Sequence, residues 1–148
     1  DQVSYIARRQ ERELRKTIRT LQSPNENPFV TAMFTARDEV EDLYRIRIEM
    51  VCGYDAEMTP HLSALVDATR EAMMNAAKHS GSDIIRAHCS AWDNHVTVLV
   101  RDQGRGFDTD TVMPKSINRR LETAGGTATF QSTDEFGTEV EMTMPKES

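Results

Sequence analysis

Residues Arg70–Gly81 read REAMMNAAKHSG, a run of helix-forming residues that stops at a serine and a glycine. At about 100° per residue, Glu71, Asn75 and Lys78 fall within a narrow arc of one helical face. The opposite face is apolar and extends back through the preceding turns, with Leu62, Leu65, Val66, Thr69, Met73, Ala76 and Ala77. The pattern predicts an amphipathic helix that presents a carboxylate, an amide and an amine on one side.

A strand and a glycine loop follow about thirty residues later. Residues Val96–Arg101 alternate as a β-branched strand that ends at Asp102, and Gly104 and Gly106 come directly after it. Glycines let the backbone approach a ligand closely, and the Asp102 carboxylate can accept a hydrogen bond from an exocyclic amine. A solvent-exposed helix face would explain the first motif alone, and a tight turn would explain the second motif alone. Their combination at this separation predicts a nucleotide site.

The two motifs resemble those of a known superfamily. Residues Glu71–His79, ExxxNxxKH, resemble the N box of the gyrase, histidine kinase and MutL ATPases, and Asp102–Phe107, DxGxGF, resembles their first glycine box. The segment Ser116–Pro145, with its RRL, GG and GT motifs, looks like the close of that domain. This segment most resembles the corresponding part of NarL/DesK-type sensor histidine kinases, particularly actinobacterial ones. The resemblance covers residues ~40–145.

This resemblance implies a set of residues for ATP and Mg²⁺. Asp102 would accept a hydrogen bond from the adenine amine, an arrangement that discriminates against guanine. Asn75 would coordinate Mg²⁺ through its amide oxygen. Glu71 would be the catalytic carboxylate, with three roles open: orienting a water, assisting proton removal, or holding the metal shell. The other residues implied in ATP binding are Lys78, His79, Gly104, Gly106, Phe107 and Thr138.

Three cations near these motifs have alternative explanations. Lys78 can face the phosphates, or it can be a cation favoured by the C-terminal end of its helix dipole. Arg119 and Arg120 can reach phosphate, or they can simply be charged side chains on the solvent-exposed face of their own helix. The second interpretation, solvation, is favoured.

The chain divides into three parts by composition. Residues 1–22 carry six Lys/Arg and three Asp/Glu, a charge of +3, so the rest carries −9 of the total of −6. This basic segment has no Gly or Pro and predicts a helix. Residues 23–28, with two prolines, predict a linker. By resemblance, residues 1–22 are the C-terminal end of the dimerisation helix and residues 29–148 the ATP-binding catalytic domain.

Periodicity within residues 29–148 predicts a two-layer α/β sandwich. By resemblance this is the Bergerat-type ATP-binding fold, with helices on one face of a mostly antiparallel sheet, joined here to an N-terminal helix. Thr59 and Pro60 are good start signals for the helix that carries Glu71. The expected elements are helices at Thr31–Leu43, Pro60–His79 and Ser116–Ala124 and strands at Tyr44–Val51, Ile85–Ala91, Val96–Arg101, Thr127–Ser132 and Glu139–Pro145.

Composition excludes several functional classes. Hydrophobic residues make up 38% and charged residues 28%, as in ordinary soluble domains, and no apolar run approaches the ~18 residues of a membrane span. A net charge of −6 argues against a general nucleic-acid binder. Cys52 and Cys89 have no metal-binding spacing and are expected to be small buried hydrophobes in a reducing compartment. We therefore expect a cytoplasmic domain, and a membrane segment upstream stays possible.

One feature departs from the family pattern. The family places a glycine-bearing lid after its first glycine box, whereas this chain has no glycine between Gly106 and Gly125. Three explanations are open: the lid is naturally short, the lid was deleted, or the printed sequence joins residues across a gap. The last explanation is favoured because such lids change position when the γ-phosphate leaves. A Cα–Cα step well above ~3.8 Å within residues 109–115 would support it.

The leading functional hypothesis is the ATP-binding kinase domain of a two-component sensor histidine kinase. It implies transfer of the ATP γ-phosphate to a histidine upstream, for relay to a response regulator of the LuxR/NarL type, within a homodimer. Residues 1–22 contain no histidine, so we expect ATP binding without autophosphorylation. The alternatives are an anti-sigma-type serine kinase, or a degenerate nucleotide-sensing module without turnover.

Overall fold

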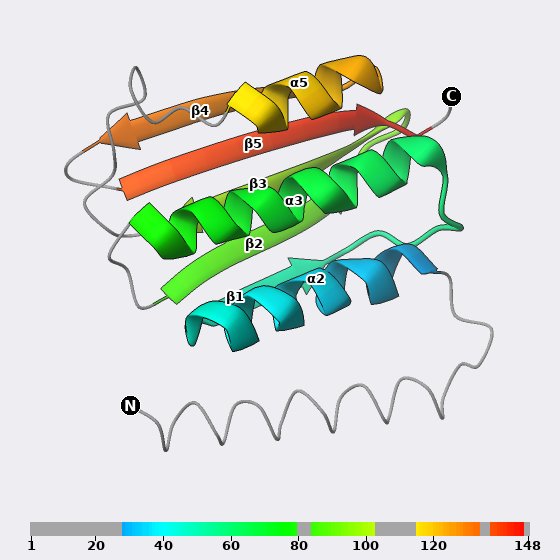
Figure 1. Ribbon diagram of the computed structural model, residues 1–148. Helices are drawn as coiled ribbons and strands as arrows, with labels where there is room; N and C mark the ends of the chain where they lie inside the picture. The colour runs from blue at the N-terminus through cyan, green and yellow to red at the C-terminus, as the bar shows by residue number, and fades with distance from the viewer. Residues whose placement is uncertain (1–27, 80–83, 103–114, 134–136, 147–148) are drawn as a thin grey trace, which may run out of the picture.

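The computed structural model describes residues 28–79, 84–102, 115–133 and 137–146. These residues form a five-stranded sheet with the strand order β1-β2-β3-β5-β4 (Figure 1). The elements are α2 (Pro28–Tyr44), β1 (Arg47–Cys52), α3 (Pro60–His79), β2 (Ile84–Ala91), β3 (His95–Asp102), α5 (Lys115–Thr123), β4 (Thr127–Thr133) and β5 (Gly137–Pro145).

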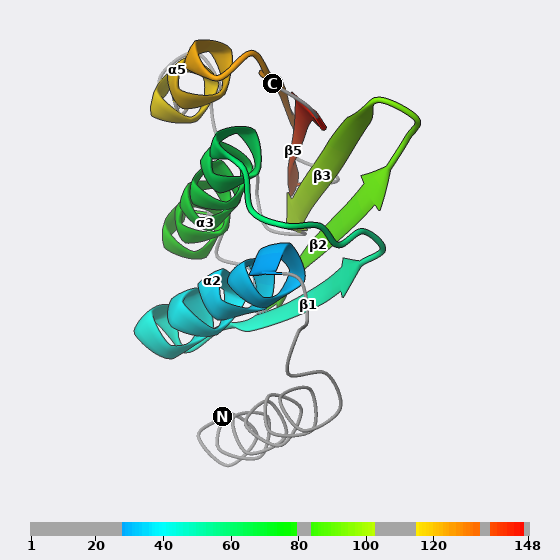
Figure 2. The same ribbon diagram turned by 90° about the vertical axis from the view of Figure 1, so that its right-hand side faces the viewer.

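The described residues form two layers. The pair β1 and β2 is parallel, whereas the other three neighbouring strand pairs are antiparallel. The three helices lie on one face of the sheet, as Figure 2 shows from the side. Helix α2 packs on β1, α3 lies over β3 and β5 at the middle of the sheet, and α5 packs on β4. The predicted α/β sandwich with a mostly antiparallel sheet is confirmed.

The core lies between the helices and the sheet. Along β3, and along β5 from Thr138 onward, every second side chain is buried on the helix side. The buried side chains of these strands include Val96, Val98, Val100, Val140, Met142 and Met144. Because β3 and β5 are inner strands, this alternation also fixes which residues at their ends face α3.

Helix α3 begins and ends where the sequence predicts. The Leu62 amide donates a hydrogen bond to Thr59 Oγ1 at 3.1 Å, which makes Thr59 the N-cap, and Pro60 opens the first turn. Its buried Thr69 hydroxyl donates to the Leu65 carbonyl at 2.8 Å, so this polar group is satisfied within the helix. The helix therefore holds its outer residues in the register that the pattern predicts.

The first helix of the domain is longer than predicted. It begins at Pro28, which the sequence assigns to the linker, three residues before Thr31. Its first turn is held by groups that lie about 25 residues away, because the Phe29 amide donates to the Ala56 carbonyl at 3.2 Å and the Val30 amide to Asp55 Oδ1 at 3.0 Å. Local sequence carries no sign of these distant partners.

The junction between α2 and β1 also differs from the expectation. The helix runs through Tyr44, and Arg45 adopts a left-handed φ of 52°, so β1 begins at Arg47 rather than at Tyr44. The Ile48 amide donates to the buried Glu41 carboxylate at 2.7 Å, which fixes the start of the strand against the helix. Cys52 at the other end of β1 is half-buried rather than buried, a correction to the expected pair of buried cysteines.

Two sequence predictions lie outside the described residues: the helix and linker before residue 28, and the lid between residues 107 and 115. Within the described ranges, no helix is long and apolar enough to cross a membrane.

Candidate functional site

A small hollow opens where α3 crosses the ends of β3 and β5. Three predicted site residues line it: Asn75 from α3, Asp102 from β3 and Thr138 from β5. Four small or branched apolar residues complete the lining: Ala72, Ala76, Val100 and Val140. The structure therefore brings together residues that are up to 63 positions apart in the chain (Asn75 to Thr138) and that the sequence could only assign separately. An apolar surface with a few polar groups is typical of small-molecule sites.

Asp102 is a buried charged residue in the lining of this hollow. It is the last residue of an inner strand, and only 1% of its surface is exposed. The Thr138 amide, itself buried, points to Asp102 Oδ1 at 3.4 Å. Burying a carboxylate is costly unless hydrogen bonds compensate it, so an acceptor in this position is well suited to a ligand that brings donors.

Gly137 brings β5 close enough to Asp102 for that contact. Its φ is +81°, and a Cβ atom there would lie 2.4 Å from the Asp102 carbonyl oxygen and 2.9 Å from Asp102 Oδ1. Any side chain would therefore push the strand away from the carboxylate. The GT motif at Gly137-Thr138 was visible in the sequence, but only Thr138 was predicted to be a site residue. The available signal was a glycine at the beginning of a strand, since Gly137 opens β5.

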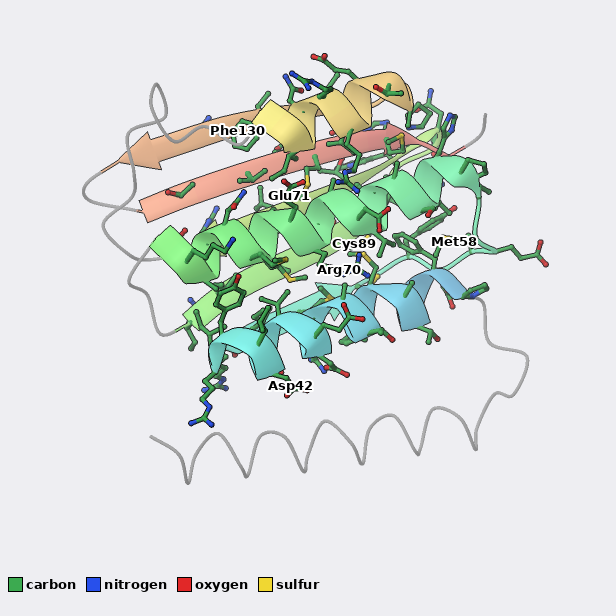
Figure 3. All side chains as sticks on the ribbon, in the orientation of Figure 1. Asp42, Met58, Arg70, Glu71, Cys89 and Phe130 are labelled. Carbon is green, nitrogen blue, oxygen red and sulfur yellow. The ribbon has the colours of Figure 1, made fainter. Side chains whose placement is uncertain are left out.

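Glu71 lies outside the lining of the hollow and faces α5. Figure 3 shows it on the α5 side of α3, where its Oε2 atom is 3.8 Å from Nη2 of Arg120. Nη1 of the same arginine is 3.5 Å from Asp67 Oδ2. Arg120 thus pairs with carboxylates of α3 although its side chain is 46% exposed, and Arg119 is exposed as well. The favoured interpretation, solvation, fits the exposure of both residues but did not include these pairs. Helix α5 is therefore connected to α3 at Glu71, one turn before Asn75.

The pairing continues across α3 to α2. Arg70 Nη1 lies 3.0 Å from Asp67 Oδ1, and Arg70 Nε lies 3.1 Å from Glu39 Oε2 on α2. We name Glu39, Arg70, Asp67, Arg120 and Glu71 the outer charge row. Its side chains are 27–57% exposed as a whole, so solvent screens the pairs that involve Glu39, Arg70 and Asp67. The Glu71 Oε2 atom that faces Arg120 is itself buried.

The remaining predicted residues are placed only in part. Lys78 is exposed in the last turn of α3 and does not line the hollow, a position that fits both of its explanations. His79 ends α3, and its side chain lies outside the described residues, as do Gly104, Gly106 and Phe107. Across the described ranges, no cluster of three or more His, Cys, Asp or Glu residues could hold a metal. A magnesium ion at Asn75 would need ligand oxygens and water to complete its shell.

No protein-family model matches this chain. The nitrate/nitrite sensor protein NarQ of Escherichia coli is 32% identical over 149 residues, which cover 92% of this chain and 25% of NarQ. The histidine-protein kinase/phosphatase DegS of Bacillus subtilis is 28% identical over 113 residues, covering 68% of this chain and 29% of DegS. The chain belongs to the sensor histidine kinases. A third relative, the sensor histidine kinase YdfH of Bacillus subtilis, is 34% identical over 85 residues.

The chain spans only 20–29% of the length of these sensor kinases. Two solved structures share this fold. The ATP-binding domain of PrrB from Mycobacterium tuberculosis superposes with a TM-score of 0.68 at 17% identity, covering 80% of this chain and 93% of that one. The mycobacterial sensor histidine kinase MprB superposes with a TM-score of 0.60 at 17% identity, covering 78% and 94%. The fold expected from the two motifs is thereby confirmed.

Proposed function

We propose that this chain is the ATP-binding catalytic domain of a sensor histidine kinase, and that ATP binds in the hollow between α3, β3 and β5. The observation that carries the proposal is the meeting of Asn75, Asp102 and Thr138 at one hollow. The kinship with sensor kinases supports it independently. In the intact protein, the γ-phosphate would pass to a histidine supplied by residues other than 1–148.

The hollow fits an adenine base. Asp102 offers a buried acceptor to the exocyclic amine, and the Thr138 amide helps to hold that carboxylate in place. The apolar lining from Val100 and Val140 suits a flat ring. Guanine carries an acceptor where adenine carries its amine, so the same carboxylate would select against guanine nucleotides.

The phosphates are assigned to the surface beyond Asn75. The Asn75 amide oxygen would hold Mg²⁺, which when bound neutralises charge on the phosphate oxygens. Glu71, one helical turn earlier, is proposed as the catalytic carboxylate that receives a proton or orients the attacking group. Lys78 and His79 would add positive charge, and Gly104, Gly106 and Phe107 would form the loop beside the nucleotide. Positioning and charge neutralisation account for most of the catalysis of phosphoryl transfer.

The rest of the kinase is assigned by kinship. We assign residues 1–22 to the end of the dimerisation helix, residues 23–28 to the linker, and residues 29–148 to the catalytic domain. The intact kinase would act as a homodimer in the cytoplasm and pass its phosphate to a response regulator of the LuxR/NarL type. A NarL/DesK-type kinase is the subgroup that the motifs favour.

Calorimetric titration tests the nucleotide site. With Mg²⁺ present, we expect the chain to bind ADP more tightly than GDP. Replacing the buried acceptor, Asp102→Asn, should weaken ADP binding by roughly 100-fold, because a buried charge-assisted hydrogen bond is lost. Asp93→Asn, the same change in the exposed turn between β2 and β3, is the matched control and should bind like the parent. Equal ADP affinity in the two variants would refute the assignment of Asp102.

Incubation with labelled ATP tests the location of the phosphoacceptor. Residues 1–148 should bind ATP and carry no acid-labile phosphate afterwards. Phosphate on any of the four histidines would contradict the proposal that the acceptor lies elsewhere.

A further inference from the structure

The two cysteines lie side by side across the parallel strands. Cys52 ends β1, Cys89 lies in β2, and the two are register partners. The amide of Gly53 donates a hydrogen bond to the Cys89 carbonyl at 2.9 Å, which locks this register directly beside the pair. Both side chains are thiols in the structure.

Their side chains share the helix-covered face of the sheet. Cys89 belongs to the core cluster, its surface is 1% exposed, and Cys52 packs against the same cluster. Cys52 is half-buried, and its sulfur lies 3.3 Å from the Tyr54 carbonyl oxygen. A hydrogen bond with the Cys52 side chain, together with burial, raises the pKa of the Cys89 thiol. The two side chains thus interact, and Cys52 is the more exposed of the two residues.

We propose that Cys52 and Cys89 form a dithiol site that low-molecular-weight disulfides oxidise to an intramolecular disulfide. Neighbouring strands lie ~4.8 Å apart, which places register partners inside the ~4.4–6.8 Å range between Cα atoms that disulfides span. Because the backbone already holds the pair in register, closure needs rotation of two side chains and no movement of the strands.

The difference in exposure sets the order of the two steps. The thiolate of the half-buried Cys52 attacks one sulfur of the reagent, forms a mixed disulfide and releases the first thiolate. The thiolate of the buried Cys89 then attacks the Cys52 sulfur and displaces the second. The two protons of the protein thiols end on the two thiols released, so two thiols are oxidised while one reagent disulfide is reduced. The second step needs the thiolate of Cys89, so it becomes faster as the pH rises.

The crosslink would close a loop that contains all of α3. A disulfide restricts the unfolded chain, so the thermal midpoint should rise by roughly 5–10 °C for a loop of this length. The pair lies on β1 and β2, whereas the hollow lies on β3, β5 and α3. We therefore expect the stability to change and the nucleotide affinity to stay nearly the same. This inference is independent of the proposed kinase function.

The test uses oxidised glutathione on the folded chain at pH 7, 8 and 9. Intact mass should show the loss of two hydrogen atoms, and a peptide map without reductant should join the peptides of Cys52 and Cys89. The thermal midpoint should rise and return on reduction. Cys89→Ser should stop with one glutathionyl group on Cys52, and Cys52→Ser should stay unmodified.

Either of two results in the parent chain would overturn the proposal. One is a stable glutathione adduct that never closes, and the other is no reaction until denaturant is added. Both readings come from the parent protein, so they do not depend on whether a serine variant folds.

Discussion

The two sides of helix α3 use charge in opposite ways. Towards the sheet, Asp102 is 1% exposed and lies beside a backbone amide in an apolar hollow. Away from the sheet, the side chains of the outer charge row are 27–57% exposed, and most of its ion pairs form in solvent. A buried carboxylate interacts strongly with any donor that reaches it, while screened pairs contribute little. Ligand binding should therefore depend on the hollow, and the outer row should affect it little.

The largest loss of stability and of nucleotide affinity is expected from a change at Gly137, which brings β5 close to Asp102 at the hollow. Gly137→Ala forces a left-handed φ on alanine and places its Cβ 2.4 Å from the Asp102 carbonyl oxygen. Strain and overpacking together should cost roughly 2–4 kcal/mol of unfolding free energy. Chemical denaturation measures this loss, and nucleotide affinity should fall with it because Asp102 is displaced.

Gly125 is the matched control for that change. Its φ is +93°, but a Cβ atom there meets nothing within 4 Å. Gly125→Ala should cost about 1 kcal/mol, from backbone conformation alone, and leave nucleotide binding unchanged. Equal losses in the two variants would mean that φ, and not the contact with Asp102, sets the requirement for glycine at position 137.

The next effect concerns the metal. If Asn75 holds Mg²⁺, Asn75→Ala should remove the benefit of Mg²⁺ for ADP binding, a loss of roughly 10-fold, and leave metal-free affinity nearly unchanged. Asn118→Ala, in α5, makes the same change away from the hollow and should keep the benefit. A benefit that persists in Asn75→Ala would move the metal site elsewhere.

What the sequence could predict depends on whether a feature is set by neighbouring residues or by contacts between distant elements. The ends of α3 and the alternation of β3 and β5 come from local patterns, a Thr59 cap and β-branched runs, so they were predictable. The Gly137 contact could not be predicted, because it depends on how closely β5 approaches the end of β3. The partners of Arg120 depend on the place of α5 beside α3, which no pattern within α5 determines.

Distant partners explain the other misses. The start of α2 depends on Asp55, 25 residues from the Val30 amide that it accepts from. The contact of Cys52 with Cys89 depends on a parallel register. Motif spacing identified Asn75 and Asp102 as candidates, but only the fold places them at one hollow.

A smaller effect is expected where the outer charge row approaches Glu71. Arg120 Nη2 is 3.8 Å from Glu71 Oε2, a long distance for an ion pair, and the two side chains as a whole are 46% and 27% exposed although Oε2 itself is buried. A double-mutant cycle with Arg120→Met and Glu71→Gln should give a coupling of about 0.5 kcal/mol or less in thermal unfolding, and high salt should reduce it. A coupling well above 1 kcal/mol would show that solvent does not screen this pair as its exposure implies.

The smallest effect is expected at Arg70, in the middle of the outer charge row. It pairs with Asp67 on its own helix and with Glu39 on α2, yet its side chain is 32% exposed and both carboxylates are more so. Arg70→Met keeps the aliphatic stem, so only charge is removed, and the unfolding free energy should change by about 0.5 kcal/mol or less. ADP affinity should stay the same, because the charge lies on the side of α3 away from Asp102. A several-fold change in affinity without a change in stability would show that charge on the outer face reaches the hollow, and would remove the division between the two sides of α3.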